Sequence, residues 1–250
     1  MKILILGGTG AMGTHLVQNL AKNGIDTFVT TRSKKESKKH ITYLQGNAKD
    51  LSFLEPILSE YWDAIVDFMV YSTVQFKNRI NLLLSATNQY IFISSARVFA
   101  NTDRVITENT DRLLDTINDE DYLSTDEYAL SKARQEDLLK SSDKNNWTII
   151  RPYITYSENR LQLGVLEKEE WLYRALKGRS IVFSKDIAQS ATTITYGADV
   201  AMGIFSIIGK QEALGNTFNI TSVESYTWEE ILAKYIDIFK KVKGFEPKVK

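Results

Sequence analysis

Short apolar runs alternate with amphipathic stretches of helical length in the first part of the chain, and this alternation is the strongest constraint on the fold. The runs are Lys2–Leu6, Thr27–Thr31, Ile41–Gln45, Ala64–Phe68, Tyr90–Ser94 and Trp147–Arg151. Strands that are apolar throughout are typical of parallel sheets buried on both faces. Helices between such strands imply right-handed crossover connections. The pattern therefore predicts an α/β fold with a parallel sheet covered on both faces.

The first apolar run leads directly into a glycine-rich turn, in the stretch ILILGGTGAMGTHL. Gly7 allows a tight turn, Gly10 lets a phosphate approach the backbone, and Gly13 lets the next helix pack close to the strand. The start of that helix offers free amide groups and a partial positive charge to an anion. We therefore expect a Rossmann-like, doubly wound sheet with a dinucleotide site at the carboxyl ends of its strands. The alternative is a glycine-rich turn without a ligand.

The end of the second run bears on which dinucleotide binds. An NAD site usually has an Asp or Glu there, which binds the ribose 2′-hydroxyl. This chain has Thr31 and Arg32 instead, followed by Ser33, Lys34 and Lys35. Because a guanidinium can pair with a 2′-phosphate, the sequence favours NADP, with NAD as the alternative. A basic turn that is merely solvated would give the same pattern.

The stretch DEYALSKARQE places Tyr128 and Lys132 four residues apart, on one face of a predicted helix. Ser124 and Glu127 form a capping-box pattern at its start. A free tyrosine, with a pKa of about 10, is a poor base at neutral pH, but a nearby ammonium group stabilises the phenolate and lowers its pKa. The pair is therefore a candidate acid–base centre.

The fifth run ends in Ser94 and Ser95, which we expect at the same edge of the sheet as the glycine turn. A hydroxyl group there could hold a substrate oxygen beside the tyrosine.

Several motifs occur along the chain in the same order as in a known protein family. They are GGTGAMG, GNAKD, DAIVDFMVY, ISSARVF, YALSK, IIRPYITYS, TTITYGADVA and GNTFNIT. Taken together over nearly the whole chain, they resemble an extended short-chain dehydrogenase/reductase of the NAD(P)-dependent epimerase/dehydratase family.

The resemblance implies roles for individual residues. Ser95 would be the catalytic hydroxyl, Tyr128 the acid–base residue, and Lys132 would bind the nicotinamide ribose and lower the pKa of the tyrosine. Asn47 would contact the adenine ring. The full set of expected dinucleotide contacts is Gly7, Thr9, Gly10, Ala11, Met12, Gly13, Thr31, Arg32, Asn47, Phe68, Met69, Val70, Ser94, Lys132, Pro152 and Tyr153.

The implied activity is hydride transfer at a carbon bearing a hydroxyl or carbonyl group, on a sugar or nucleotide sugar, by a reductase or an epimerase. Three features depart from the family pattern. Ile154 replaces a common Asn that often helps to hold a nucleotide-sugar diphosphate, and Ser157 replaces a common Gly. Ala96 and Arg97 follow Ser95 where the dehydratase subgroup has Asp-Glu, which disfavours a dehydratase. The alternative is a non-catalytic dinucleotide-sensing or RNA-binding relative, although such relatives often lose the Tyr–Lys pair.

Composition narrows the remaining possibilities. Lys plus Arg equals Asp plus Glu, 31 each, so the formal charge of zero gives no sign of nucleic-acid binding. With no cysteine and two histidines, neither disulfides nor a His/Cys metal site is expected. No apolar stretch approaches the roughly 20 residues of a membrane span, and the N-terminus does not resemble a signal peptide. We expect a cytoplasmic enzyme, and a homodimer by analogy with relatives.

We expect residues 1–152 to form the NAD(P)-binding domain. Residues 153–250 would form a mixed region, a small substrate lobe together with helices and strands that return to the sheet, and not an independent domain. Within it, Glu167–Gly178 and Tyr226–Val242 are predicted helices, and Trp171 is predicted core. The chain is short for this family, so either the lobe is reduced or the sequence continues. Residues 101–127 carry nine acidic and two basic residues, which indicates a functional loop or a solvated excursion.

Overall fold

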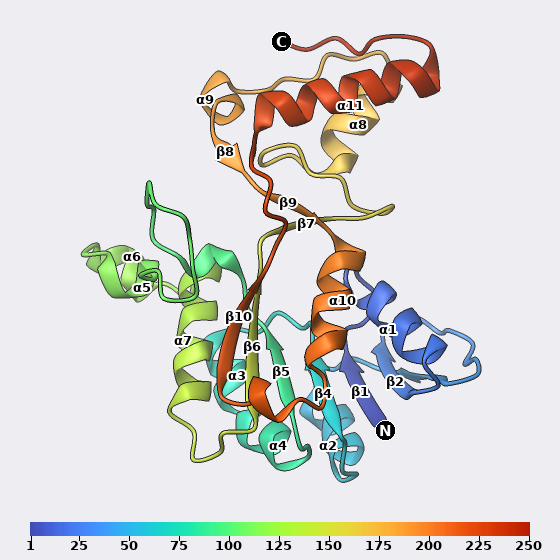
Figure 1. Cartoon of the computed structure of the whole chain (residues 1–250), viewed down its shortest axis with the longest axis vertical. Coiled ribbons are helices and arrows are strands. Elements are labelled where there is room, and N and C mark those ends of the chain that lie inside the picture. Colours follow the sequence, from blue (N-terminus) through green and yellow to red (C-terminus); the bar gives the residue numbers. More distant parts are fainter. The chain divides into compact units, whose positions relative to one another are not determined.

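The structure is a computed structural model that covers residues 1–250 and divides into two compact units (Figure 1). The first unit comprises Met1–Tyr153 and Ala198–Ile220, and the second comprises Ile154–Gly197 and Thr221–Lys250. The chain therefore leaves the first unit after β6, returns to it for one helix and one strand, and leaves it again.

A seven-stranded sheet is the framework of the first unit. Its strands are β1 (Lys2–Leu6), β2 (Asp26–Thr31), β3 (Ile41–Gln45), β4 (Ala64–Asp67), β5 (Tyr90–Ile93), β6 (Trp147–Pro152) and β10 (Asn216–Ile220). Their order is β10-β6-β5-β4-β1-β2-β3, and every neighbouring pair is parallel. The predicted parallel α/β sheet is confirmed, and each predicted run coincides with a strand to within one residue at either end.

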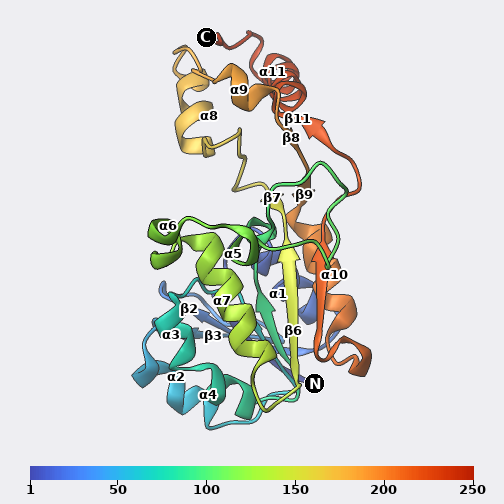
Figure 2. The same ribbon diagram turned by 90° about the vertical axis from the view of Figure 1, so that its left-hand side faces the viewer.

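Helices cover both faces of this sheet. They are α1 (Gly13–Lys22), α2 (Leu51–Leu58), α3 (Thr73–Lys77), α4 (Ile80–Ser85), α7 (Tyr128–Lys140) and α10 (Gly197–Ile207). The short helices α5 (Leu113–Thr116) and α6 (Glu120–Ser124) precede α7, and 3-10 turns occur at Ala96–Val98 and Gln211–Ala213. Figure 2 shows α7 along one face of the sheet and α10 along the other.

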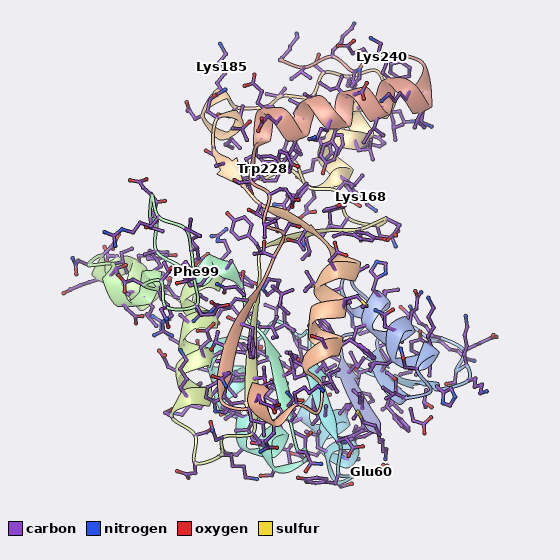
Figure 3. The ribbon with its side chains drawn as sticks, viewed as in Figure 1. Glu60, Phe99, Lys168, Lys185, Trp228 and Lys240 are labelled. Carbon is purple, nitrogen blue, oxygen red and sulfur yellow. The ribbon has the colours of Figure 1, made fainter.

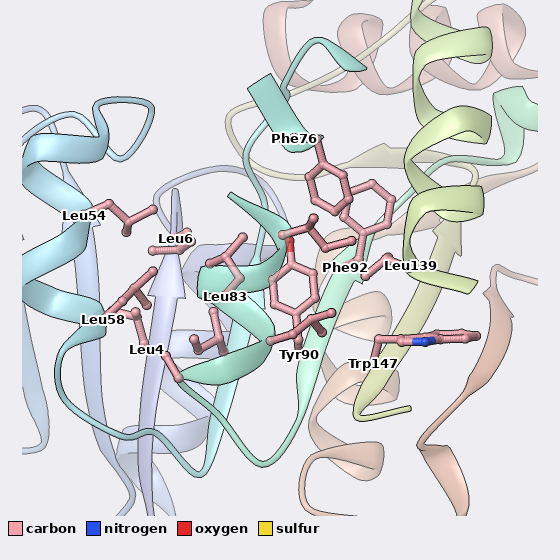
Figure 4. Close-up of a cluster of buried hydrophobic side chains, with 14 of the residues drawn as sticks. Leu4, Leu6, Leu54, Leu58, Phe76, Leu83, Tyr90, Phe92, Leu139 and Trp147 are labelled. Carbon is pink, nitrogen blue, oxygen red and sulfur yellow. The ribbon is translucent and has the colours of Figure 1, made fainter. Parts of the chain in front are cut away.

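Alternation along each strand supplies both faces with apolar side chains. In β1, Leu4 and Leu6 pack with α2, α4 and α7, as Figure 4 shows for part of this cluster. Ile3 and Ile5 point to the opposite face and pack with α1 and α10. Because all of these side chains are buried, a polar group within either layer needs a partner in the protein.

The predicted capping box at the start of α7 is wrong. Ser124 is the last residue of α6, and Glu127 is itself the N-cap of α7, where its carboxylate accepts a hydrogen bond from the amide of Ala129 at 2.7 Å. The three residues between the helices, Thr125, Asp126 and Glu127, do not continue either of them. Tyr128 is consequently the first residue of α7, at the end of the helix that faces the carboxyl edge of the sheet.

The acidic segment is fixed to the first unit at several points. Arg112 donates to Asp115 and to Asp137 of α7, each at 2.7 Å. The carboxylate of Glu108 accepts from the amide of Asn219 at 2.7 Å. These contacts make part of this segment a cover over α7 and β10, while many of its other acidic side chains are exposed.

The second unit has a small core of its own. Its elements are β7 (Ile154–Tyr156), α8 (Lys168–Leu176), α9 (Lys185–Ala188), β8 (Ala191–Thr192), β9 (Ile194–Tyr196), β11 (Tyr226–Thr227) and α11 (Trp228–Lys243). Strand β7 pairs with β9 in parallel, and β8 pairs with β11 in antiparallel fashion. Trp171 is buried, as predicted, and stacks on Tyr235 at 4.8 Å between ring centroids. Figure 3 labels Trp228 and Lys240 toward the two ends of α11.

Both predicted helices of this unit are present, with ends that differ from the prediction by one or two residues. None of the helices of either unit combines the length and the apolar character needed to cross a bilayer.

Candidate functional site

The sheet brings several of the predicted site residues to one edge. Strand β1 lies between β2 and β4, and the chain changes direction across the sheet at this point, since β2 and β3 lie on one side of β1 while β4, β5 and β6 lie on the other. In open parallel sheets, ligands bind outside the carboxyl ends of the strands at such a switch point. The turns that follow β1, β2, β4 and β5 all lie at this edge.

The glycine turn after β1 has the geometry that a phosphate would need. Gly7 has a φ of +73°, and a Cβ there would lie 2.7 Å from the sulfur of Met69. At Gly13, a Cβ would lie 2.7 Å from the backbone of Gly8, so the start of α1 packs directly on the turn. At Gly10 a Cβ would meet nothing within 4 Å. Packing within the chain thus explains two glycines, and Gly10 leaves open space.

The start of α1 adds electrostatic attraction for an anion. Met12 is its N-cap, no side chain caps the first turn, and this turn contains no acidic residue. The amide of Thr14 donates to the carbonyl of Gly10 at 3.1 Å, and the positive end of the helix dipole still favours an anion here. Thr9 is exposed at the tip of the turn, and Ala11 is half-buried. The residues present fit the phosphates of a dinucleotide.

The turns after β2 and β3 differ in how firmly they are held. Thr31 is buried, and its hydroxyl donates to the carbonyl of Ser33 at 3.1 Å. Arg32 is exposed and has neither an ion pair nor a hydrogen bond, so its guanidinium can reach a ligand. Asn47 is exposed after β3, and its side-chain oxygen accepts from the amide of Lys49 at 3.2 Å. Its amide group is left to make further contacts.

Buried Arg79 holds the loop that carries Asn47. Its guanidinium donates to the carbonyl groups of Ala48 at 3.2 Å and Lys49 at 3.0 Å, and it lies 4.3 Å from the ring centroid of Tyr71. The loop after β3 is thereby tied to the segment after β4.

That segment carries Phe68, Met69 and Val70. Phe68 and Met69 are half-buried and Val70 is exposed, and the side chain of Met69 lies directly against the glycine turn at Gly7. The amide of Met69 donates to the carboxylate of Asp67 at 2.9 Å. The backbone of this segment is held by the carboxylate of Asp67, while Val70 remains exposed.

The two serines after β5 have different environments. Ser94 is buried, and its hydroxyl donates to Glu136 at 2.6 Å, so a contact of Ser94 with a ligand would have to use its backbone. Ser95 is half-buried, and its hydroxyl oxygen accepts from the amide of Arg97 at 3.1 Å. This leaves the hydroxyl proton of Ser95 for another acceptor.

Helix α7 carries Tyr128, 39% exposed, and Lys132, 2% exposed, on the same face. The ammonium of Lys132 donates to the carbonyl of Ile93 at 2.8 Å, the last residue of β5. It also lies 4.4 Å from the ring centroid of Phe92. Burial lowers the pKa of Lys132 to about 8, while the nearby carboxylates of Asp67 and Glu136 act in the opposite direction. Lys132, the buried member of the predicted pair, is therefore packed against the end of β5.

An exposed ion pair links the same two segments. Arg97 lies 3.3 Å from Glu127, the residue before Tyr128. Helix α7 is thus joined to the end of β5 by Lys132 and to the turn after Ser95 by this ion pair.

Pro152 and Tyr153 are the last two residues of the first unit before the chain enters the second unit. Pro152 is the last residue of β6 and is buried, and Tyr153 is half-buried.

Two buried carboxylates beside these residues were not anticipated from the sequence. Asp67 ends β4 in an otherwise apolar run, and Glu136 lies on α7 one turn after Lys132. Arg151 binds Glu136 through two nitrogens, at 2.9 and 2.6 Å. Two features of the sequence could have indicated them. Asp67 is an acidic residue at the end of an apolar strand, and Glu136 continues the four-residue spacing of Tyr128 and Lys132.

Comparison with known proteins gives the class. A model of the NAD dependent epimerase/dehydratase family matches residues 3–221. The chain belongs to this family, whose members are enzymes of the short-chain dehydrogenase/reductase type.

Particular relatives are of two kinds. The chloroplast stem-loop binding protein of 41 kDa b of Arabidopsis thaliana is 29% identical, over 93% of this chain and 61% of that protein. A UDP-glucose 4-epimerase of Lacticaseibacillus casei is 28% identical, over 57% of this chain and 47% of that protein. The chain thus spans about three fifths of one relative and about half of the other.

Solved structures share the fold. UDP-glucuronic acid 4-epimerase from Bacillus cereus in complex with NAD aligns with a TM-score of 0.77, at 18% identity, over all of this chain and 85% of that one. MoeE5 in complex with UDP-glucuronic acid and NAD aligns with a TM-score of 0.75, at 14% identity, over all of this chain and 85% of that one. The Rossmann-like fold predicted from the sequence is confirmed.

Proposed function

We propose that this protein binds a nicotinamide dinucleotide across β1 and β4 and catalyses hydride transfer at a hydroxyl- or carbonyl-bearing carbon of a sugar or nucleotide sugar. The observation that carries the proposal is the contact between Lys132 and the carbonyl of Ile93, which packs the Tyr128 helix against the exit of β5. The acid–base pair and Ser95 then belong to one arrangement at the edge where the glycine turn lies.

Each residue has a separate task in this proposal. Tyr128 takes the proton from a substrate hydroxyl during oxidation and returns it during reduction. Ser95 donates a hydrogen bond to the same substrate oxygen and holds it in place. Lys132 supplies the positive charge that favours the phenolate form of the tyrosine. When bound, the dinucleotide supplies the hydride acceptor or donor.

Reductase and epimerase differ in what happens after the first transfer. A reductase releases the changed dinucleotide, whereas an epimerase retains it and returns the hydride to the opposite face of the same carbon. The epimerases among the relatives and solved structures support a nucleotide-sugar substrate. Ile154, which replaces the family's common Asn at the diphosphate, counts instead against a nucleotide sugar and for a simpler sugar substrate.

For the dinucleotide itself, the proposal is NADP. No acidic residue ends β2 or lies among the four residues after it, and the exposed guanidinium of Arg32 suits a 2′-phosphate. The similar solved structures contain NAD, which supports NAD for those proteins and makes it the alternative here. A cytoplasmic location and a homodimer complete the proposal.

The proposal is tested first by mass spectrometry of the purified protein under native conditions and again after denaturation. A protein that arrives empty and binds NADPH more tightly than NADH in titration supports a reductase. Retained NAD would favour an epimerase and overturn the role of Arg32. Binding of neither dinucleotide would refute the enzyme hypothesis. A panel of UDP-sugars, with product analysis by chromatography, then identifies the substrate.

A second candidate is RNA binding, because the relative that covers most of this chain is named for binding a stem-loop. Exposed basic residues also follow β2, namely Arg32, Lys34, Lys35, Lys38 and Lys39. An electrophoretic mobility assay with a stem-loop RNA tests this candidate. Salt-sensitive binding that survives Tyr128→Phe would favour it, because phosphate contacts depend on salt and not on the acid–base pair.

A further inference from the structure

Asp67 is one of two fully buried carboxyl groups close to the proposed acid–base pair, the other being Glu136. The side chain of Asp67 is 0% exposed, and three donors converge on it. The Tyr90 hydroxyl donates at 2.8 Å, the Met69 amide at 2.9 Å and the Tyr71 hydroxyl at 3.5 Å. Burial raises the pKa of both tyrosines well above the ordinary value, so they remain protonated donors.

A carboxyl group surrounded by donors is favoured in its ionised form. Burial raises the pKa of Asp67 above its ordinary value, and these hydrogen bonds together with the charge of Lys132 limit that rise. An isolated buried charge would be too costly to retain, so a counter-charge is required. Asp67 is the partner of Phe92 across β4 and β5, and the ammonium of Lys132 lies 4.4 Å from the ring centroid of Phe92, so Lys132 is the cation next to this carboxyl group. Each of the two groups stabilises the charged form of the other.

The same region is also joined mechanically to α7. The carbonyl of Tyr71 accepts from Ser131 at 3.3 Å and from Gln135 at 2.9 Å, which lie one residue before and three residues after Lys132 in α7. Asp67 thus lies at the junction between the segment 68–70 and the helix of the acid–base pair.

We propose that Asp67 is a positioning residue of this site, whose buried carboxylate keeps Lys132 protonated and at the same time fixes the backbone at Met69. The inference rests on the proposed function. It assigns to one residue of the sheet core the control of both the acid–base helix and the proposed dinucleotide-binding segment.

The other charged groups near Asp67 and Lys132 have partners of their own. Glu136 also faces Lys132, but it is bound by Arg151 at 2.6 Å and lies within 4 Å of Arg112 and Lys140, so those cations offset its charge. Arg79 lies over Tyr71 and donates to backbone carbonyls. Asp67 is therefore the carboxylate whose charge is left for Lys132.

The test is NMR of the full chain with ¹³C- and ¹⁵N-labelled lysine, following the side-chain signal of Lys132 against pH and assigning it by its loss in Lys132→Met. In Asp67→Asn, which retains the shape and the acceptor for Met69, the titration midpoint of Lys132 should move to lower pH. Tyr90→Phe is the matched control, since it removes one hydrogen bond and keeps the carboxylate, and should leave the midpoint close to that of the wild type. An unchanged midpoint in Asp67→Asn overturns the proposal.

A reciprocal measurement covers the case in which Asp67→Asn does not fold. With labelled aspartate, the carboxyl signal of Asp67 should titrate at higher pH in Lys132→Met than in the wild type, because the stabilising cation is gone. Identical titrations would overturn the proposal. Since neither experiment uses a dinucleotide, failure of NADPH and NADH to bind would refute the proposed function separately.

Discussion

The side-chain nitrogen of Lys132 lies 2.8 Å from the carbonyl oxygen of Ile93, which joins the middle of α7 to the last residue of β5. The next two residues along the chain are Ser94 and Ser95. A lysine that is 2% exposed loses most of its hydration, and this contact replaces part of it. The position of the lysine is therefore determined by the sheet and not by the helix alone.

Replacement of Lys132 by Met should lower turnover by about 10²- to 10⁴-fold, the usual contribution of a positioned acid–base group. Met fills a similar volume, so the protein should still fold. Turnover is measured with the substrate identified by the UDP-sugar panel, alongside the thermal midpoint. Lys140→Met, on the exposed face of the same helix, is the control and should retain activity. Equal turnover in both variants would contradict the assignment of Lys132.

The buried lysine also predicts how stability changes with pH. The pKa of Lys132 is about 8 in the folded protein against an ordinary value of 10.5, so the folded state loses this proton before the unfolded chain does. Below pH 8 the cost of burying the charge is fully present, and it is relieved as pH rises toward 10.5. Relative to Lys132→Met, the wild type should gain up to about 3 kcal/mol across this window.

Urea unfolding at several pH values measures this difference, and subtraction of the Met variant cancels the groups that titrate alike in both proteins. A difference that stays constant, or that falls as pH rises, would show that Lys132 is not charged and buried in the folded state.

The strands could be predicted closely because a strand buried on both faces is apolar throughout, so its ends are marked by the first polar or turn residues. Contacts between residues far apart in the sequence could not be predicted in this way. Asp67 lies near Lys132 only because β4 pairs with β5 and α7 packs on β5, and no local pattern specifies either relationship. The capping prediction failed for a local reason, since Ser124 and Glu127 have the spacing of a capping box but Ser124 ends the preceding helix.

Two glycines of the turn after β1 should respond differently to the same substitution. Gly10→Ala adds a Cβ into open space, so stability should change by no more than about 0.5 kcal/mol. Dinucleotide affinity should nevertheless fall by about tenfold or more, because the methyl group occupies the approach of the phosphate. Fluorescence titration with NADPH and NADH measures this loss.

Gly13→Ala is the matched variant, because its Cβ would lie 2.7 Å from the backbone of Gly8. It should destabilise the fold by about 1–3 kcal/mol, as overpacking does. If Gly10→Ala bound the dinucleotides as tightly as the wild type, the glycine turn would not be the phosphate site.

Arg32→Ala should separate the two dinucleotides. The side chain is exposed and has no partner in the protein, so stability should be unchanged. The affinity for NADPH should fall by about tenfold or more, which corresponds to loss of a charge-assisted hydrogen bond of about 1.5–3 kcal/mol. The affinity for NADH, which lacks the 2′-phosphate, should remain the same. Lys34→Ala serves as a control for general positive charge, and an equal effect of both variants would rule out a specific role of Arg32.

Glu136→Gln should be among the most destabilising single substitutions in the first unit. The carboxylate is 0% exposed and is bound by Arg151 and by the hydroxyl of Ser94. Removing its charge leaves the buried guanidinium without a counter-ion, which costs about 3–5 kcal/mol.

Urea unfolding measures the loss, and Glu169→Gln, at an exposed position near Lys168, is the control, with an expected change within about 0.5 kcal/mol. The double variant Glu136→Leu with Arg151→Met removes both charges, so it should be more stable than Glu136→Gln alone. A double variant that is less stable than Glu136→Gln would mean that the pair contributes more than the cost of burying its two charges.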